Sequence, residues 1–304
     1  MAGCTLCPRS CGADRGGGQK GRCHVDGKLR VARAALHFWE EPCISGEKGS
    51  GAVFFSGCPL GCVYCQNQAI SRGRAGTEIT SERLARIFLK LEGQGAHNLN
   101  LVTAGHYVPQ VLEALSLAKK DGFSLPVVWN SSGYETVRTL RMLDGFVDIY
   151  LPDLKYLDPG LAKQYSGAED YPAVAKAALG EMVRQCPSPV FNEEGLMTSG
   201  VIARHLLLPG HVREAKRVAS YLYETYGNQI YISLMNQYTP PAAFRVQREK
   251  ASGSFPALLA RKVTKREYDR LLDYAAQIGI ENGFFQEGGT ADESFIPEFD
   301  GTGV

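Results

Sequence analysis

The chain has 304 residues and a formal net charge of +1, with 44% hydrophobic and 21% charged residues. This length suits one large α/β domain, alone or with a small appendage, and the composition is that of a soluble globular protein. The nearly neutral balance gives no reason to expect a nucleic acid or a membrane surface as a partner.

Nine cysteines stand out against this ordinary composition, and eight of them precede residue 66. The chain shows no secretory signal pattern and no apolar run near the ~20 residues that a membrane-spanning helix needs, so we expect a cytoplasmic protein. A reducing compartment disfavours disulfides, so clustered cysteines there are candidate metal ligands.

The segment before residue 48 is predicted to be a separate unit. Its glycine run, 16–18, cannot contribute to an apolar core, and four free thiols around that run would be reactive. We therefore expect a metal centre, either zinc or iron–sulfur, and favour a structural metal over an electron carrier. Its predicted ligands are Cys4, Cys7, Cys11 and Cys23. The expected domains are a Cys-rich metal-binding segment, 1–47, and a main domain, 48–304.

From about residue 50, short apolar runs alternate with helical patterns. Strands are expected at 52–56, 98–103, 126–130, 147–151, 203–208, 229–234 and 283–287. Helices are expected from Thr80–Ser81, over 108–120, 134–142, 170–185 and 212–225, and from a capping box at Thr264–Glu267. This alternation indicates βα units around a parallel sheet. Six or so units suit a partial barrel, although a doubly wound open sheet has the same signature; both place the ligand site at the carboxyl ends of the strands.

The loop directly after the first of these strands carries Cys58, Cys62 and Cys65. This spacing lets one short loop hold three irons of a 4Fe–4S cubane and leaves the fourth iron open. A zinc knuckle completed by a distant ligand is the alternative, but the position at a strand end and the aromatic Tyr64 favour the cluster. Of the two remaining cysteines, Cys186 is expected to be a packing thiol, and the role of Cys43 stays open.

This loop resembles that of the radical SAM (S-adenosylmethionine) superfamily. The stretches 34–46, 65–71 and 233–238 extend the likeness to proteins related to pyruvate formate-lyase activating enzymes, over nearly the whole chain. The resemblance implies an α/β fold, a partial (βα)6 TIM-like barrel, whose cluster binds SAM at its open iron. It also implies cleavage of SAM by one electron, from a reductant such as flavodoxin or ferredoxin, to a 5′-deoxyadenosyl radical that abstracts hydrogen from a substrate.

The same resemblance assigns a SAM pocket to the ends of the later strands. The assigned residues are Tyr64, Gly105, His106, Asn130, Ser132, Asp153, Lys155, Val201, Arg204 and His205. His106 stands where an acid usually meets the SAM amino group, Asn130 replaces an aspartate that helps to hold a cation, and Lys155 matches a partner for the SAM carboxylate.

Each of these assignments has a structural alternative. Asp153 and Lys155 could form an ion pair at the barrel rim, His205 could be a core histidine, and 130–133 is also an ordinary turn sequence. At the level of function, the alternative to SAM cleavage is an iron–sulfur binding or electron-transfer protein. Within the enzyme hypothesis, the substrate is a protein, a peptide or a small molecule, and activation of a glycyl radical enzyme is one form of it. The excursion 236–261 would either shape the entrance for a partner's loop or cover a small-molecule site.

Overall fold

The computed structural model describes residues 3–241, 257–286 and 297–304, and within them it contains one sheet of ten strands. The strand order is β10-β9-β8-β6-β5-β4-β2-β1-β3, with β7 paired to β8 outside this path. The strands are β1 (Arg30–His37), β2 (Ser50–Phe55), β3 (Thr77–Glu78), β4 (Leu99–Val102), β5 (Val127–Ser131), β6 (Ile149–Pro152), β7 (Val190–Phe191), β8 (Met197–Leu206), β9 (Tyr231–Met235) and β10 (Gly283–Phe285).

The sheet from β2 to β10 is parallel, and β1 and β7 are antiparallel to their neighbours. The helices are α1 (Pro42–Ser45), α2 (Gln68–Ser71), α3 (Ser81–Gly93), α4 (Val108–Lys120), α5 (Val137–Arg141), α6 (Pro159–Ser166), α7 (Tyr171–Gln185), α8 (Val212–Tyr226) and α10 (Lys265–Gln277), with short 3-10 turns η1 (Gly105–Tyr107), η2 (Gly227–Gln229) and η3 (Ala257–Ala260). None of these helices is long and apolar enough to cross a lipid bilayer.

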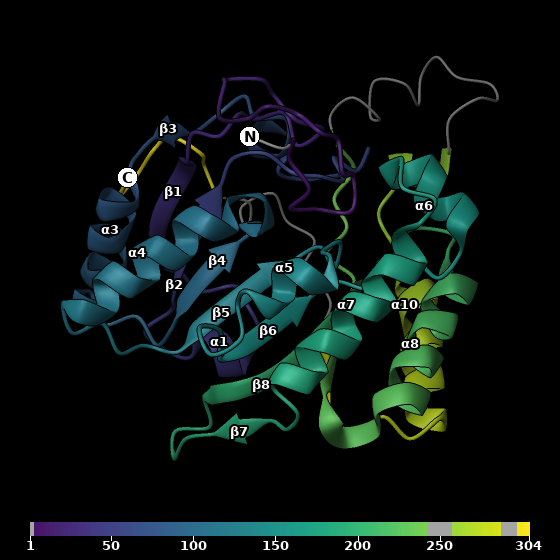
Figure 1. The fold of residues 1–304 in the computed structure, drawn as a ribbon. Helices are drawn as coiled ribbons and strands as arrows, with labels where there is room; N and C mark the ends of the chain where they lie inside the picture. The colour runs from purple at the N-terminus through teal and green to yellow at the C-terminus, as the bar shows by residue number, and fades with distance from the viewer. Residues whose placement is uncertain (1–2, 242–256, 287–296) are drawn as a thin grey trace.

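The predicted α/β architecture is confirmed as an open barrel. Six βα units follow one another, from β2–α3 to β9–α10, before the last strand β10, and the described strands do not close the sheet into a ring. Figure 1 shows α3, α4, α7, α8 and α10 around the outside of the curved sheet. The parallel strands are buried on both faces, which explains why their sequences read as continuous apolar runs.

Helix α3 shows how closely local sequence determines the elements. The Thr80 hydroxyl accepts the backbone N–H of Arg83 at the start of the helix, and Leu84, Phe88 and Leu91 bury the face that their spacing predicts. Strand β8 instead begins six residues before the predicted 203, because Met197–Ser199 form an antiparallel pair with β7 outside the parallel sheet.

Helix α10 begins with the predicted capping box, in which Thr264 and Glu267 satisfy each other's backbone N–H groups. We expect Thr264→Ala to lower the free energy of unfolding by about 1 kcal/mol, because the first turn loses an acceptor. Urea unfolding of the two proteins, monitored by circular dichroism, measures the difference. A change in midpoint that Thr264→Ser reproduces would contradict the capping explanation, since serine keeps the hydroxyl.

Residues 30–45 lie within the predicted N-terminal segment, yet they form part of the barrel. Strand β1 pairs with β2 along most of its length. Helix α1 then passes beneath the sheet, where Cys43 and Ile44 pack against the amino-terminal parts of the strands, including Val128 and Ile149. Cys43 is therefore a buried core thiol, whose pKa burial raises to about 12. Cys186 is buried as well, with its thiol directed at the carbonyl of Val147.

Candidate active site

A cavity of about 270 Å³ lies at the carboxyl ends of the strands, beside the loop that follows β2. Gly57 and Gly61 both have positive φ angles, 93° and 59°, which let this loop turn sharply around its three cysteines. The lining residues are His37, Trp39, Glu40, Phe54, Cys58, Leu60, Cys62, Tyr64, Cys65, Gln66, Asn67, Val102, Thr103, Asn130, Ser131, Ser132, Asp153, Lys155, Arg204, Leu206, Met235, Gln237 and Pro297.

Arg204, from β8, organises the polar wall of this cavity. Its guanidinium donates to the carboxylate of Asp153 (Nε–Oδ1, 3.1 Å), to the amide oxygen of Asn130 (2.6 Å) and to the carboxylate of Glu40 (3.1 Å). Asp153 also receives the ammonium of Lys155 at 2.6 Å. Burial alone would raise the pKa of Asp153, but the two cations outweigh it and hold that pKa below its usual value. The wall therefore presents fixed charges of both signs beside the three cysteines.

Six of the ten predicted SAM-pocket residues line this cavity: Tyr64, Asn130, Ser132, Asp153, Lys155 and Arg204. The Tyr64 hydroxyl accepts a hydrogen bond from Tyr156 (2.6 Å), and its ring packs edge-on against Tyr165 and Tyr238. Asp153 and Lys155 form an ion pair, which was the structural alternative to a role in binding SAM, but both residues line the cavity.

Residues 52–184 match the family model described as the radical SAM superfamily. This stretch of the chain is therefore similar to a radical SAM domain. A curated relative, an uncharacterized protein of Methanocaldococcus jannaschii, is 26% identical over 286 residues, which cover 91% of this chain and 75% of that protein. Two of the solved structures to which this chain is similar are of Streptococcus suis SuiB. The one bound to S-adenosylmethionine has a TM-score of 0.48 at 13% identity, and the one bound to precursor peptide SuiA has 0.47 at 12%. Each match covers 77% of this chain but only 49% and 47% of the SuiB chains, so this chain spans about half their length.

A radical SAM domain implies a 4Fe–4S cluster and SAM, and the donor set of the cavity fits both. Burial raises the pKa of both Cys58 and Cys65, and hydrogen bonds from the backbone of Gly61 and Leu60 to Cys58 and from Ser71 and the backbone of Asn67 to Cys65 oppose that rise. Among the described residues, no three His, Cys, Asp or Glu side chains are grouped as one metal ion requires. A cubane differs from a single ion in this respect, because each thiolate binds a different iron. Cys58, Cys62 and Cys65 remain the predicted ligands.

The other four predicted pocket residues lie away from the cavity lining. Along β8, side chains alternate between faces, so Arg204 points inward while Val201 and His205 point toward the helices. The Nδ1–H of His205 donates to the carbonyl of Leu154 at 2.8 Å, as in a satisfied core histidine. Gly105 and His106 belong to the turn η1, which leads the chain away from the cavity.

His106 is buried, and its Nε2 lies 2.8 Å from the carbonyl of Ser56. Burial lowers its pKa to about 4, against an unfolded value near 6.5. Between these values only the unfolded chain takes up the proton, so the free energy of unfolding should fall as the pH drops from 6.5 to 4, with a slope of up to about 1.4 kcal/mol per pH unit. In urea titrations across this range, His106→Gln should flatten the dependence. An unchanged slope in the variant would contradict this origin.

Glu40 is a cavity residue that the sequence did not single out. Its carboxylate accepts hydrogen bonds from Asn100 and Asn130, at 3.0 Å each, and from Arg204. Glu40 follows β1, within the segment 1–47 that the sequence predicts to be separate from the barrel. The available signal was the position of two acids just after an apolar stretch within 34–46, one of the stretches that resembles the family.

Proposed function

We propose that this protein is a radical SAM enzyme that reductively cleaves S-adenosylmethionine and uses the resulting radical to abstract hydrogen from a substrate. The observation that carries the proposal is that Cys58, Cys62 and Cys65 line the same cavity as Asp153, Lys155 and Arg204. When bound, the cluster supplies the electron that breaks the sulfonium bond of SAM.

The remaining chemistry is that of binding and orientation by residues of the cavity. The Lys155 ammonium is suited to the SAM carboxylate, while the carboxylates of Asp153 and Glu40 are suited to its amino group. Arg204 fixes both carboxylates through its three hydrogen-bonded contacts and so sets the geometry of this wall. Apolar side chains of the lining, Leu206 and Met235, exclude water from the part of the cavity near them.

The substrate is proposed to be a protein or peptide, and activation of a glycyl radical enzyme is the form that the family resemblance favours. Phe38 and Trp39 support a macromolecular substrate, since they leave 49% and 60% of their surfaces exposed beside the cavity and the adjoining hollow. Much of the predicted entrance, 236–261, falls outside the described residues. Mixing the reduced enzyme and SAM with a glycyl radical enzyme from the same cell should give a protein-borne radical by electron paramagnetic resonance. The absence of that signal would direct the search to peptides and small molecules.

SAM cleavage itself can be tested without the substrate. The protein is reconstituted anaerobically with iron and sulfide, reduced with dithionite and given SAM, and 5′-deoxyadenosine is quantified. We expect 5′-deoxyadenosine from the wild type and none from Cys62→Ala. Cys186→Ala is the control and should also give product, because the Cys186 thiol is buried in the core and does not line the cavity. Equal yields from the wild type and Cys62→Ala would refute the proposal. A cluster without any product would identify the electron-transfer alternative.

A further inference from the structure

The N-terminal cysteine segment, 3–24, rests directly on the loop that carries Cys58, Cys62 and Cys65. The carbonyl of Cys23 accepts the backbone N–H of Cys58 at 3.2 Å, so one residue of each cysteine set forms a hydrogen bond with the other. Gly57 leaves no room for a side chain here, because a Cβ atom would lie 2.8 Å from that carbonyl. Figure 1 shows the N-terminal coil at one end of the sheet, at the top of the view.

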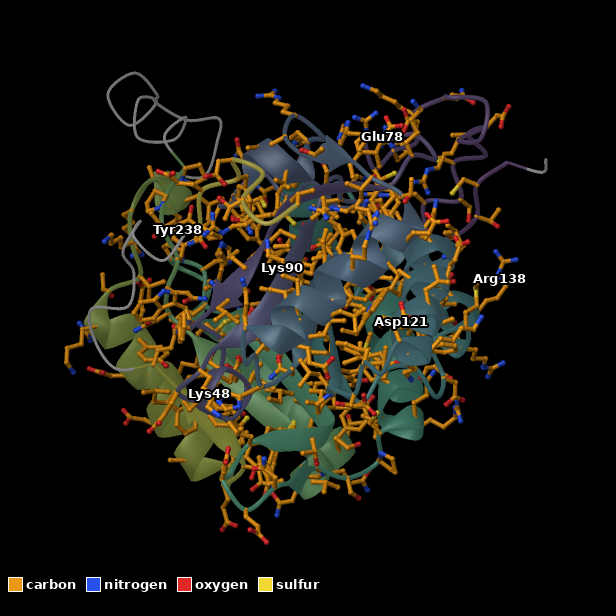
Figure 2. The ribbon with its side chains drawn as sticks, turned by 90° about the vertical axis from the view of Figure 1, so that its left-hand side faces the viewer. Lys48, Glu78, Lys90, Asp121, Arg138 and Tyr238 are labelled. Atoms are coloured by element: carbon orange, nitrogen blue, oxygen red, sulfur yellow. The ribbon has the colours of Figure 1, made fainter. Side chains whose placement is uncertain are left out.

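Arginines hold this segment in place where apolar burial cannot. Arg9 donates to the carbonyls of Pro59 and Ser166, at 2.9 Å each, and the Ser166 hydroxyl lies 3.0 Å from the sulfur of Cys62. From the barrel side, Arg138 of α5 donates to the side chain of Thr5 at 2.6 Å. Figure 2 shows Arg138 at the edge of the molecule, on the side where the N-terminal coil lies. The segment is thus fixed against the barrel at several points.

Like the cysteines of the radical SAM loop, the four cysteines of this segment are not grouped as a single metal ion requires, but their surroundings suit a cluster of several irons. Gly21 leaves a space between two of them, since a Cβ atom there would lie 3.3 Å from the sulfur of Cys11 and 3.4 Å from that of Cys23. The backbone two residues further on hydrogen-bonds the sulfur at Cys7 and Cys11, whereas the Cys23 thiol donates to the carbonyl of Val25 at 3.8 Å. Cys58 and Cys65 of the radical SAM loop have the same contact. Such bonds stabilise thiolates and tune the potential of iron–sulfur clusters.

Exposure and charge along the segment suit the passage of electrons. Cys11 is exposed, Cys4 and Cys7 are partly buried, and Cys23, which contacts Cys58, is 5% exposed. Arg15 lies beside the set, with its guanidinium 3.9 Å from the sulfur of Cys4. A nearby cation favours the more negative, reduced form of a cluster and so makes it a better electron acceptor. Exposure thus falls from Cys11 at the surface to Cys23 at the radical SAM loop. A zinc ion carries no electrons, so this order would serve no purpose at a zinc site.

We propose that Cys4, Cys7, Cys11 and Cys23 bind a second iron–sulfur cluster, which passes electrons to the radical SAM cluster across the contact between Cys23 and Cys58. One electron enters from a reduced flavodoxin-type donor, which is oxidised by one electron. The N-terminal cluster is reduced and then reoxidised, and no bond forms or breaks until the electron is consumed in the cleavage of SAM. The relay rests on the proposed function, whereas the second cluster does not. The structure thus favours a redox role over the structural metal that the sequence favoured.

The metal content of four proteins tests the second cluster. After anaerobic reconstitution with iron and sulfide, we expect about eight irons per chain in the wild type and in Cys186→Ala, and about four in Cys7→Ala/Cys11→Ala and in Cys62→Ala. Cys62→Ala should also keep the electron paramagnetic resonance signal of a reduced cluster. One zinc ion per wild-type chain, or an iron content that Cys7→Ala/Cys11→Ala does not lower, would overturn the assignment. These readouts stand even if no SAM is cleaved.

The choice of reductant tests the relay. With reduced flavodoxin as the donor, Cys7→Ala/Cys11→Ala should form 5′-deoxyadenosine at least about tenfold more slowly than the wild type. With dithionite, a small molecule that can reach the catalytic cluster directly, the two should agree within about twofold. Equal losses with both reductants would show a structural role, and no loss with either would show that electrons bypass the segment; each result overturns the relay.

Discussion

Asp153→Asn is expected to lower the free energy of unfolding by about 3 kcal/mol and to weaken SAM binding at least about tenfold, because it leaves two buried cations without their shared carboxylate. Lys155 and Arg204 both contact Asp153, and all three side chains are less than a fifth exposed. Arg204 would keep its contacts with Glu40 and Asn130, so the loss should fall mainly on Lys155 and on the geometry of the wall. Urea unfolding measures the stability and equilibrium dialysis of SAM measures the affinity.

Asp300→Asn is the matched control, since it removes a carboxylate from an ion pair with Arg33 at the surface. That pair is more exposed, so its loss should cost much less stability than that of Asp153 and leave SAM binding unchanged. The folded-state pKa values of Asp153 and Asp300 are both lowered, so the contributions of both carboxylates are lost in acid. Because the folded-state pKa of Asp153 is depressed, its contribution is present above the unfolded value near 3.9 and is lost as the pH falls through the folded value. A stability loss in Asp153→Asn no larger than in Asp300→Asn would show that this network does not support the fold.

Gly57→Ala is expected to prevent assembly of the radical SAM cluster and to cost more than about 3 kcal/mol of stability. Gly57 has a φ angle of 93°, which already disfavours a side chain by about 1 kcal/mol or more. A Cβ atom would in addition lie 2.8 Å from the carbonyl of Cys23 and 2.9 Å from Nε2 of His106, so the loop and the N-terminal segment would have to move apart. Iron content and thermal unfolding measure the two effects.

Gly122→Ala separates backbone strain from crowding. Gly122 has nearly the same φ angle, 94°, but no atom lies within 4 Å of the position its Cβ would take. This variant should therefore lose only about 1 kcal/mol and retain its full iron content. If the two alanine variants were destabilised equally, the close approach of Cys23 to the loop would not be a constraint on the fold.

The sequence predicted the periodic parts of the fold well, because each is determined by local pattern. Helix α4 has the predicted bounds, and α3 and α10 begin at their predicted caps. The sequence also predicted those cavity residues that lie at the ends of strands, such as Asn130 and Asp153. His106 could not be placed, because the turn η1 that diverts it follows a positive φ at Thr103, which no local sequence signal announces.

The role of residues 30–45 escaped prediction for a different reason. Their contacts are with distant parts of the chain: β1 with β2, and Glu40 with Asn100, Asn130 and Arg204. The composition of this region suggests a segment separate from the barrel. Strand pairing with β2 and the contacts of Glu40 in the cavity make it part of the barrel. Similarly, the alternation along β8 was visible, yet which of its two faces would meet the cavity depends on strands far apart in sequence.

Strand β1 has a consequence for how the molecule behaves at high concentration. It lies near the margin of the sheet, and β3 covers it only at Arg30 and Val31. Further along, the backbone of Ala32 and Ala34 bonds instead to residues 301–302. An uncovered margin would offer its free N–H and carbonyl groups to the same strand of another molecule. Residues 301–302 therefore occupy backbone groups of β1 that could otherwise pair with a second molecule.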